Sequence, residues 1–367
     1  MSPDIQVSEQ SLYLLVPVRK KVIMCKKNIL WMLLLFVAMT LSAQGDRPLV
    51  FTVSQTQKNC FRTINEAIQA APEHALQPVI IYIKNGIYRE KILIDRPHIC
   101  LVGENRDSTR IILAELNKKQ STKEMFGKPL GPGIIYLNEE GNDCTIARLT
   151  AYNNYGTTVE RTIQHQMTVF SRATRVKIFD CTIMSDGHDD VSMWDTDGGY
   201  YYHADCYFQS PGYDFVCPRG WCYMTRCTVY GKGSGGAMIW HDGRYGEDVK
   251  FVMRDCYFDS SVPVILGRYH HDSQFFLINC SCSHKIIDRP ISSAYSYQML
   301  DSIALGNRVY FYNFKREGGN FKWMKNNLEE SKQKPSPDEI TAKWTFQGKW
   351  DPEVEASRLK AYMKNLK

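Results

Sequence analysis

The stretch "FDCTI" (residues 179–183) recurs along this chain in altered form. Related stretches follow it at intervals of 21 to 29 residues: "ADCYF" (204–208), "TRCTV" (225–229), "RDCYF" (254–258) and "INCSC" (278–282). A polar residue precedes the cysteine in at least four of the five stretches, and β-forming residues follow it in most. A repeat of this length indicates a solenoid, in which each turn of the chain stacks on the one before.

Segments upstream of this repeat also look like short strands broken by Gly, Asn and Asp. They are "VIIYIKNGIYREKILI" (79–94), "HICLVG" (98–103), "GIIYL" (133–137) and "DCTIARLTAYNN" (143–154). Few segments show the periodicity of a helix. We therefore predict an all-β protein with the architecture of a parallel β-helix, forming one domain over residues 44–367.

The repeated cysteines are expected to form a ladder inside the coil. Its members are Cys181, Cys206, Cys227, Cys256 and Cys280. A buried free cysteine behaves as a small apolar side chain. Disulfides are the alternative in an exported protein, and Cys217 and Cys222 are the first pair to check for one. Because no cysteine–histidine group has the spacing of a zinc site, we expect no metal.

The open ends of a solenoid need covering. Residues 61–72, "FRTINEAIQAAP", have helical periodicity, a capping box formed by Thr63 and Glu66, and a stop at Pro72. We predict that this helix caps the N-terminal end. From about residue 316 the strand pattern is lost, and we expect an irregular C-terminal tail that packs along the outside or covers the other end.

The first 43 residues are predicted to be a signal peptide. From Met24 the chain has two lysines, an apolar run over residues 29–41, and small residues up to Ala43, after which cleavage is expected. Met24 is an alternative start, because residues 1–23 lack this order. The apolar run is shorter than the roughly 20 residues that span a bilayer. We expect an exported protein, periplasmic or secreted, with no membrane span in its mature form.

The overall composition is that of a globular protein, with 44% hydrophobic and 23% charged residues among 367. The formal net charge is +6, and it falls to +3 beyond residue 43 because five basic and two acidic residues lie before that point. No basic block stands out, which argues against a nucleic-acid partner.

An acid stands in an apolar stretch at "GYDFVCPRG" (212–220), where Asp214 lies between Tyr213 and Phe215. Burying an ionised carboxylate costs several kcal/mol unless it is paired or hydrogen-bonded. Asp189, in "SDGHDDVSMW" (185–194), lies 25 residues upstream, which is one repeat. Coils stack ~4.8 Å apart, so the two acids should be neighbours on one face. Two carboxylates at this distance favour one protonated and one ionised member, the pair that nucleophilic and acid–base chemistry needs.

These residues carry a resemblance to the pectin methylesterase family of carbohydrate esterases. The stretches that resemble the family's motifs are "GIYREKI" (86–92), "HQMTVFS" (165–171), "HDDVS" (188–192), "YDFVCPRG" (213–220), "MIWHDGR" (238–244), "LGRYH" (266–270) and "PSPDEITAKWTFQGKWDP" (335–352). The similarity runs from about residue 50 to residue 352. It implies a right-handed parallel β-helix and an enzyme that acts on pectin, an acidic polysaccharide, in pectin catabolism or cell-wall modification.

The resemblance also implies roles for single residues. Asp214 takes the position of the nucleophile that attacks the methyl ester of a galacturonate unit, and Arg268 holds it ionised. Gln166 takes the position of an oxyanion donor, and Asp189 that of the acid and base. His188 replaces a glutamine of the family, so its charge is expected to vary near pH 6.5. The family needs no metal or organic cofactor, and we expect a monomer.

Four further residues are expected to contact substrate: His270, Tyr269, Phe215 and Trp194. His270 stands at the position of a tryptophan in the family and Tyr269 at that of a proline, so the pocket walls should differ and favour an unusual or branched pectin. Three neighbouring acids are interpreted as turn residues: Asp190, expected in solvent, with Asp195 and Asp197.

Two other functions remain open. A glycosidase resembling polygalacturonase would also use paired carboxylates, about 5–9.5 Å apart. A non-catalytic solenoid that binds pectin would keep the fold without turnover, and the histidines at 188 and 270 leave this possibility open. A calcium-dependent lyase is disfavoured, because no cluster of three or more carboxylates is expected on one face. Asp214 could also be a structural acid paired with Arg219 or Arg268.

Overall fold

The computed structural model describes residues 48–117, 123–233, 235–243, 246–271, 273–294 and 308–366. The predicted signal peptide therefore lies outside the described residues. The described residues belong to one compact unit. Among them, no helix is both long enough and apolar enough to cross a membrane.

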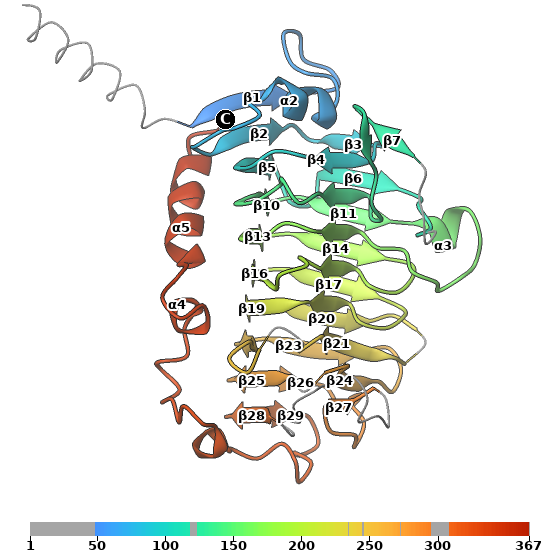
Figure 1. The fold of residues 1–367 in the computed structure, drawn as a ribbon. Coiled ribbons are helices and arrows are strands. Elements are labelled where there is room, and N and C mark those ends of the chain that lie inside the picture. Colours follow the sequence, from blue (N-terminus) through green and yellow to red (C-terminus); the bar gives the residue numbers. More distant parts are fainter. Residues whose placement is uncertain are drawn as a thin grey trace, which may run out of the picture. The chain divides into compact units, whose positions relative to one another are not determined.

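Three parallel sheets, here called A, B and C, run the length of the molecule (Figure 1). Sheet A consists of β1 (Leu49–Val53), β2 (Val79–Ile83), β5 (Ile99–Gly103), β10 (Thr145–Ala147), β13 (Val176–Phe179), β16 (Gly199–Ala204), β19 (Gly220–Thr225), β22 (Phe251–Arg254), β25 (Gln274–Ile278) and β28 (Arg308–Tyr312). Sheet B consists of β3 (Gly86–Tyr88), β6 (Thr109–Leu113), β11 (Thr150–Asn153), β14 (Thr182–Ser185), β17 (Tyr207–Ser210), β20 (Thr228–Gly231), β23 (Tyr257–Ser260), β26 (Ser281–Cys282) and β29 (Lys315–Arg316). Sheet C consists of β4 (Ile92–Ile94), β9 (Ile135–Leu137), β12 (Val169–Ser171), β15 (Val191–Met193), β18 (Val216–Pro218), β21 (Ala237–His241), β24 (Ile265–Tyr269) and β27 (Ser292–Ser293).

Most coils add one strand to each sheet, and each new strand pairs in parallel with its counterpart in the coil before. The interior between the sheets is filled by apolar side chains in one continuous core. The predicted parallel β-helix is therefore confirmed. A short antiparallel hairpin, β7 (Glu124–Met125) with β8 (Lys128–Pro129), stands apart from the three sheets.

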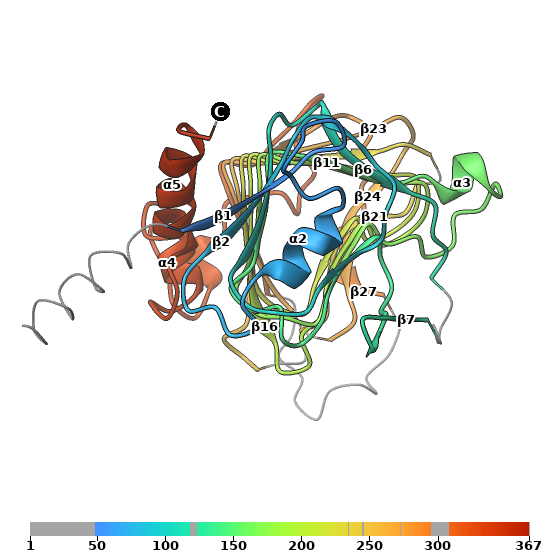
Figure 2. The ribbon, with the colours of Figure 1, turned by 90° about the horizontal axis from the view of Figure 1, so that it is seen from above.

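Helix α2 (Ile64–Ala70) covers the N-terminal end of the coil, as predicted (Figure 2). Thr63 and Glu66 form the expected capping box. Ile64 and Ile68 are buried in the core that α2 closes. The Glu90 carboxylate accepts hydrogen bonds from the backbone N–H of Ile64 and Asn65, so it satisfies donors at the start of this helix.

The C-terminal tail is more regular than we expected. It contains a 3-10 turn η1 (Leu328–Glu330) and the helices α4 (Ala342–Thr345) and α5 (Pro352–Met363). These pack against the outer face of sheet A through Phe346, Trp350 and Met363. The sequence of α5 has only a weak apolar stripe, and its start is fixed locally by the Asp351 cap and Pro352. Tertiary packing therefore decides that this segment is helical.

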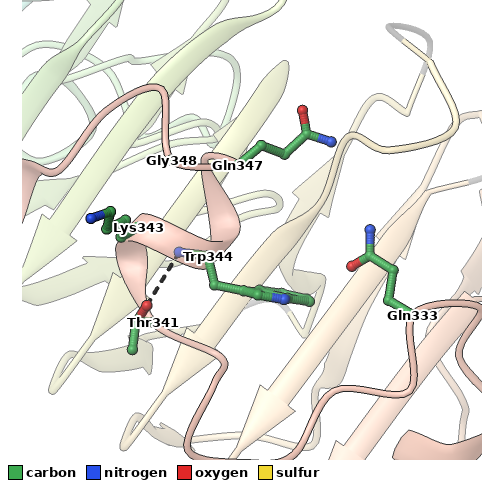
Figure 3. Close-up of a pocket in the computed structure, with 6 residues that line it drawn as sticks. All are labelled: Gln333, Thr341, Lys343, Trp344, Gln347 and Gly348. Atoms are coloured by element: carbon green, nitrogen blue, oxygen red, sulfur yellow. Dashed lines mark hydrogen bonds between the residues drawn. The ribbon is translucent and has the colours of Figure 1, made fainter.

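A surface pocket lies beside α4. It is lined by Gln333, Thr341, Lys343, Trp344, Gln347 and Gly348 (Figure 3). The Trp344 indole projects into the space between the two glutamine side chains. No carboxylate lines this pocket, so it lacks the acids that the sequence singles out for chemistry.

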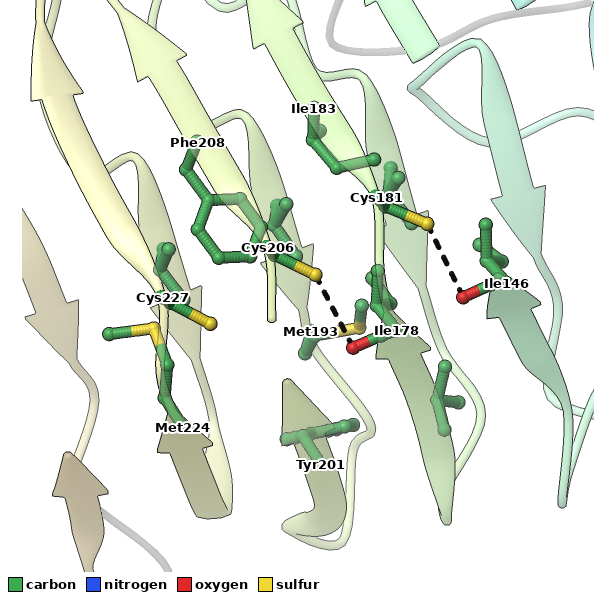
Figure 4. Packing of buried hydrophobic residues seen from close by; sticks show 14 of the residues in the cluster. Ile146, Ile178, Cys181, Ile183, Met193, Tyr201, Cys206, Phe208, Met224 and Cys227 are labelled. Atoms are coloured by element: carbon green, nitrogen blue, oxygen red, sulfur yellow. Dashed lines mark hydrogen bonds between the residues drawn. The ribbon is translucent and has the colours of Figure 1, made fainter. Parts of the chain in front are cut away.

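The repeated cysteines are buried and form the predicted ladder at the corner between sheets A and B. Figure 4 shows three of them, Cys181, Cys206 and Cys227. The polar residue before each cysteine has a left-handed backbone, with φ between 51° and 56° at Asp180, Asp205, Arg226, Asp255 and Asn279. This conformation turns the chain sharply from one sheet to the next, and Asp and Asn tolerate it better than most residues. All cysteines within the described residues are unpaired thiols, including Cys217 and Cys222.

Candidate active site

Asp189 and Asp214 occupy equivalent positions in successive coils, at the corner between sheets B and C. Val191 pairs with Val216, two residues beyond each acid, and the Asp189 N–H donates to the Tyr213 carbonyl at 3.0 Å. Both acids have left-handed backbones, with φ of 64° and 55°. Only 4% of Asp189 and 7% of Asp214 is exposed. The predicted stacking of the two acids is therefore present.

Arg268 reaches Asp214 from strand β24, two coils further along sheet C. Its Nε donates to one carboxylate oxygen at 3.0 Å and its Nη2 to the other at 2.8 Å. The guanidinium also lies 5.1 Å from the ring centroid of Tyr213. A bidentate contact of this kind fixes the direction of a carboxylate as well as balancing its charge.

The surroundings of Asp214 raise its pKa. Burial raises its pKa to about 6, and the negative charge of Asp189 adds to this effect. The hydrogen bonds and positive charge of Arg268 act in the opposite direction but do not offset burial. Asp214 is thus ionised at neutral pH, yet more basic than an ordinary aspartate rather than less.

His188 is held in its neutral form. Its Nδ1 accepts a hydrogen bond from the Tyr213 backbone N–H at 2.8 Å, which places the ring proton on Nε2. Burial lowers the pKa of His188, against the pull of the Asp189 charge. The expected change of its charge near pH 6.5 is therefore displaced to more acidic pH.

His165 is a residue of this site that the sequence did not single out. Its Nδ1 lies 2.5 Å from Oδ2 of Asp189, and its ring centroid lies 5.6 Å from that of His188. The position of His165 directly before Gln166 could have indicated it from the sequence. In the structure it forms a parallel bridge with His188 in the next coil.

Gln166 is fully buried, and both ends of its amide are engaged by the segment that includes helix α3 (Tyr155–Thr158). Its Oε1 accepts from the Gly156 N–H at 3.0 Å, and its Nε2 donates to the Thr162 carbonyl at 2.7 Å. These contacts hold the segment against Gln166. They also use the Gln166 amide, which the resemblance assigned as the hydrogen-bond donor to the oxyanion.

Two of the four predicted substrate contacts are wrong. Phe215 is 1% exposed and Tyr269 is 6% exposed, and both belong to the interior core. Tyr269 directly follows Arg268 in strand β24, and successive side chains of a strand point to opposite faces. Phe215 lies between the left-handed Asp214 and β18, outside any strand, and its ring packs in the core. Trp194 and His270 are half-buried on the outer side: Trp194 donates to the Cys217 carbonyl at 3.1 Å, and His270 packs against Trp240.

The prediction for Asp190 is also wrong. Its side chain is fully buried, and neither carboxylate oxygen has a hydrogen bond of ordinary geometry within the described residues. Burial raises the pKa of Asp190 well above the usual range, because the carboxylate form is poorly solvated there. The turn at Asp195 and Asp197 is as expected, because the Asp197 N–H donates to the Asp195 carboxylate at 2.9 Å. No group of three or more His, Cys, Asp or Glu in the described ranges is arranged to hold a metal ion.

Comparison with solved structures shows which fold this is. A pectin methylesterase from Erwinia chrysanthemi aligns with a TM-score of 0.62 and 17% identity, covering 83% of this chain and 98% of that one. The carrot pectin methylesterase aligns with a TM-score of 0.59 and 18% identity, covering 77% and 88%. At these identities the likeness establishes the right-handed parallel β-helix and nothing finer.

Sequence comparison adds the family. Probable pectinesterase 56 of Arabidopsis thaliana is 31% identical over 180 residues, which is 48% of this chain and 56% of that protein. Putative pectinesterase 11 of the same plant is 26% identical over 226 residues, 60% of this chain and 58% of that protein. The chain thus spans little more than half the length of these relatives. The family model described as Pectinesterase matches residues 50–237, just over half of the chain. This chain therefore belongs to the pectinesterase family.

Proposed function

We propose that this protein removes methyl groups from the galacturonate esters of pectin. The main support is the environment of Asp214. Its nearly buried carboxylate accepts hydrogen bonds from Nε and Nη2 of Arg268, and the second buried acid, Asp189, lies one coil away. Membership of the pectinesterase family supports the same class of reaction. The groups at this corner need no metal or organic cofactor for it.

In the first half of the reaction an oxygen of Asp214 attacks the C6 carbonyl of the ester. The carboxylate is suited to this because it is ionised above pH 6, weakly solvated and held in one direction by Arg268. The bond between C6 and the methoxy oxygen then breaks, and the acid–base centre at Asp189 supplies the proton with which methanol leaves. Asp214 and C6 remain joined as an anhydride.

In the second half a water molecule attacks C6. The Asp189 centre takes the proton of this water, and the bond between C6 and Asp214 breaks with its electron pair returning to Asp214. We assign the oxyanion donor to Nε2–H of His188 rather than to Gln166. Nδ1 of His188 is occupied by the Tyr213 N–H, whereas the Gln166 amide is used by Gly156 and Thr162. One such donor is typically worth about 3 kcal/mol in the transition state.

Methanol release from methyl-esterified pectin tests the proposal. We expect Asp214→Asn to lower kcat by about 10³-fold or more, because the nucleophile is lost. Asp255→Asn is the matched control: Asp255 has the same φ of 55°, stands at the A–B corner and is exposed. Equal rates for the two variants would contradict the proposal. New reducing ends without methanol would support a glycosidase instead, and pectin binding without turnover in the unmodified protein would support a binding solenoid.

A further inference from the structure

The contact between His165 and Asp189 joins a buried acid to a solvent-facing base. The Asp189 side chain is 6% exposed and that of His165 is 59% exposed, and 2.5 Å separates Oδ2 from Nδ1. Because Nδ1 is engaged with the carboxylate, the second ring nitrogen, Nε2, is the one that can exchange a proton outside this pair. This is the arrangement of a base that is oriented by a third group.

The proposed reaction sets a requirement that this pair can meet. The nucleophile must have lost its proton at the same pH at which the acid still carries one. Asp214 reaches its ionised form only above about pH 6. An ordinary carboxyl group has lost its proton by then, whereas an imidazole next to a carboxylate keeps its own to higher pH.

The two neighbouring histidines have opposite surroundings. His188 accepts a backbone N–H at Nδ1 and is neutral, and both His165 and Arg268 disfavour a positive charge on it. His165 instead faces the Asp189 carboxylate. The charge of His165 also favours the ionised form of Asp214, so the electrostatic influence of the ring reaches the nucleophile. Asp189, Asp214 and His188 are thus among the charged and titratable groups that face His165.

We propose that His165 is a catalytic residue, whose imidazole carries the proton that leaves with methanol, and that Asp189 orients and charges this ring. The inference rests on the proposed esterase function and deepens it. In the first half-reaction Nε2–H of the imidazolium gives its proton to the methoxy oxygen as the C6–O bond breaks. The neutral ring keeps its Nδ1–H on Asp189. In the second half-reaction Nε2 takes a proton from water as the water oxygen bonds to C6 and Asp214 departs as a carboxylate.

Substitution of the exposed ring tests the role with little risk to the fold. We expect His165→Gln to lower kcat for methanol release by about 10²- to 10³-fold at pH 7 with KM nearly unchanged. His284→Gln is the matched control, because His284 is 63% exposed and lies 3.5 Å from the carboxylate of Glu317, outside the site. The double variant His165→Gln/Asp189→Asn should lose little more than the worse single variant, because the two residues act as one unit.

Three further readouts separate proton transfer from a structural role. Added imidazole should restore part of the rate of His165→Ala. The alkaline limb of kcat/KM should move to lower pH in His165→Gln. The His165 ring resonances should titrate at lower pH in Asp189→Asn than in the unmodified protein, a result that does not depend on activity.

The role of His165 and the esterase activity can fail separately. An active His165→Gln with an unchanged pH profile, beside an inactive Asp214→Asn, would overturn the role of His165 and leave the esterase intact. A folded but inactive His165→Ala that imidazole does not rescue would also overturn it. An active Asp214→Asn would instead contradict the proposed function itself.

Discussion

Aspartates with a left-handed backbone stand at two corners of the coil, but their side chains have different surroundings at the two. At the A–B corner Asp180, Asp205 and Asp255 have φ of 52°, 56° and 55°, and at the B–C corner Asp189 and Asp214 have 64° and 55°. The first group is half-buried or exposed. Burial raises the pKa of Asp180, whereas the hydrogen bonds and charges of Arg226 and Lys360 outweigh burial and lower that of Asp205. The second group is almost fully buried, and burial raises the pKa of Asp214 to about 6 although Arg268 holds both of its oxygens.

An aspartate can stand at a corner for either of two physical reasons. A left-handed residue is needed wherever the chain turns sharply between sheets, and aspartate tolerates that conformation whatever its surroundings. Reactivity depends on what surrounds the carboxylate once the coils have stacked. An acid in water is a weak nucleophile, whereas a desolvated acid with one bidentate partner is poised to react.

Removing the arginine at each corner should give the largest contrast in stability. We expect Arg268→Ala to lower the free energy of unfolding by about 2–3 kcal/mol at pH 8, because the buried Asp214 carboxylate loses its partner. Arg226→Ala removes a partner of Asp205, which is half-buried and also paired with Lys360, and should cost less than about 1 kcal/mol. Urea unfolding measures both values, and equal losses would mean that burial does not distinguish the corners.

The same variant should move the activity profile. Methanol release requires ionised Asp214, so kcat/KM of the unmodified enzyme should rise with pH through about 6. Loss of the Arg268 charge raises the pKa of Asp214 further, so any remaining activity of Arg268→Ala should appear only at higher pH. An acid limb that stays in place would show that Arg268 does not act through Asp214.

A smaller effect is expected at Asp190, which follows Asp189 at the B–C corner. Its pKa is raised by burial, so between the ordinary value of 3.8 and the folded value the folded protein binds more protons than the unfolded chain. Stability of the unmodified protein should therefore fall as pH rises through this range. Asp190→Asn has no proton to lose, so we expect it to match the unmodified protein near pH 4 and to exceed it by about 1 kcal/mol or more at pH 8. Thermal unfolding at the two pH values checks this, and a stability difference that shrinks with rising pH would contradict it.

The smallest effect is expected at the A–B corner. The ladder cysteines are unpaired thiols that stabilise the coil by packing. A reducing agent should therefore leave the Tm unchanged within error. A fall of several degrees would mean that disulfides form in the protein in solution.

Much of the fold could be predicted because its signals are local. The spacing of the cysteines, the polar residue before each of them and the capping box at Thr63 and Glu66 are all visible in neighbouring residues. Helix α5 was missed because its few apolar residues acquire a helical face only against sheet A. Phe215 and Tyr269 were misplaced because the side on which a residue points depends on where each corner falls.

The sequence by itself determined the coil, its period and the stacking of residues 189 and 214, because one repeat of chain is one turn of the helix. Tertiary structure alone decided how those positions ionise and what they touch. The burial of Asp190, the contact of His165 with Asp189 and the commitment of the Gln166 amide all arise from segments brought together by packing. Desolvation and hydrogen bonding depend on such neighbours in space, which the order of residues along the chain does not specify.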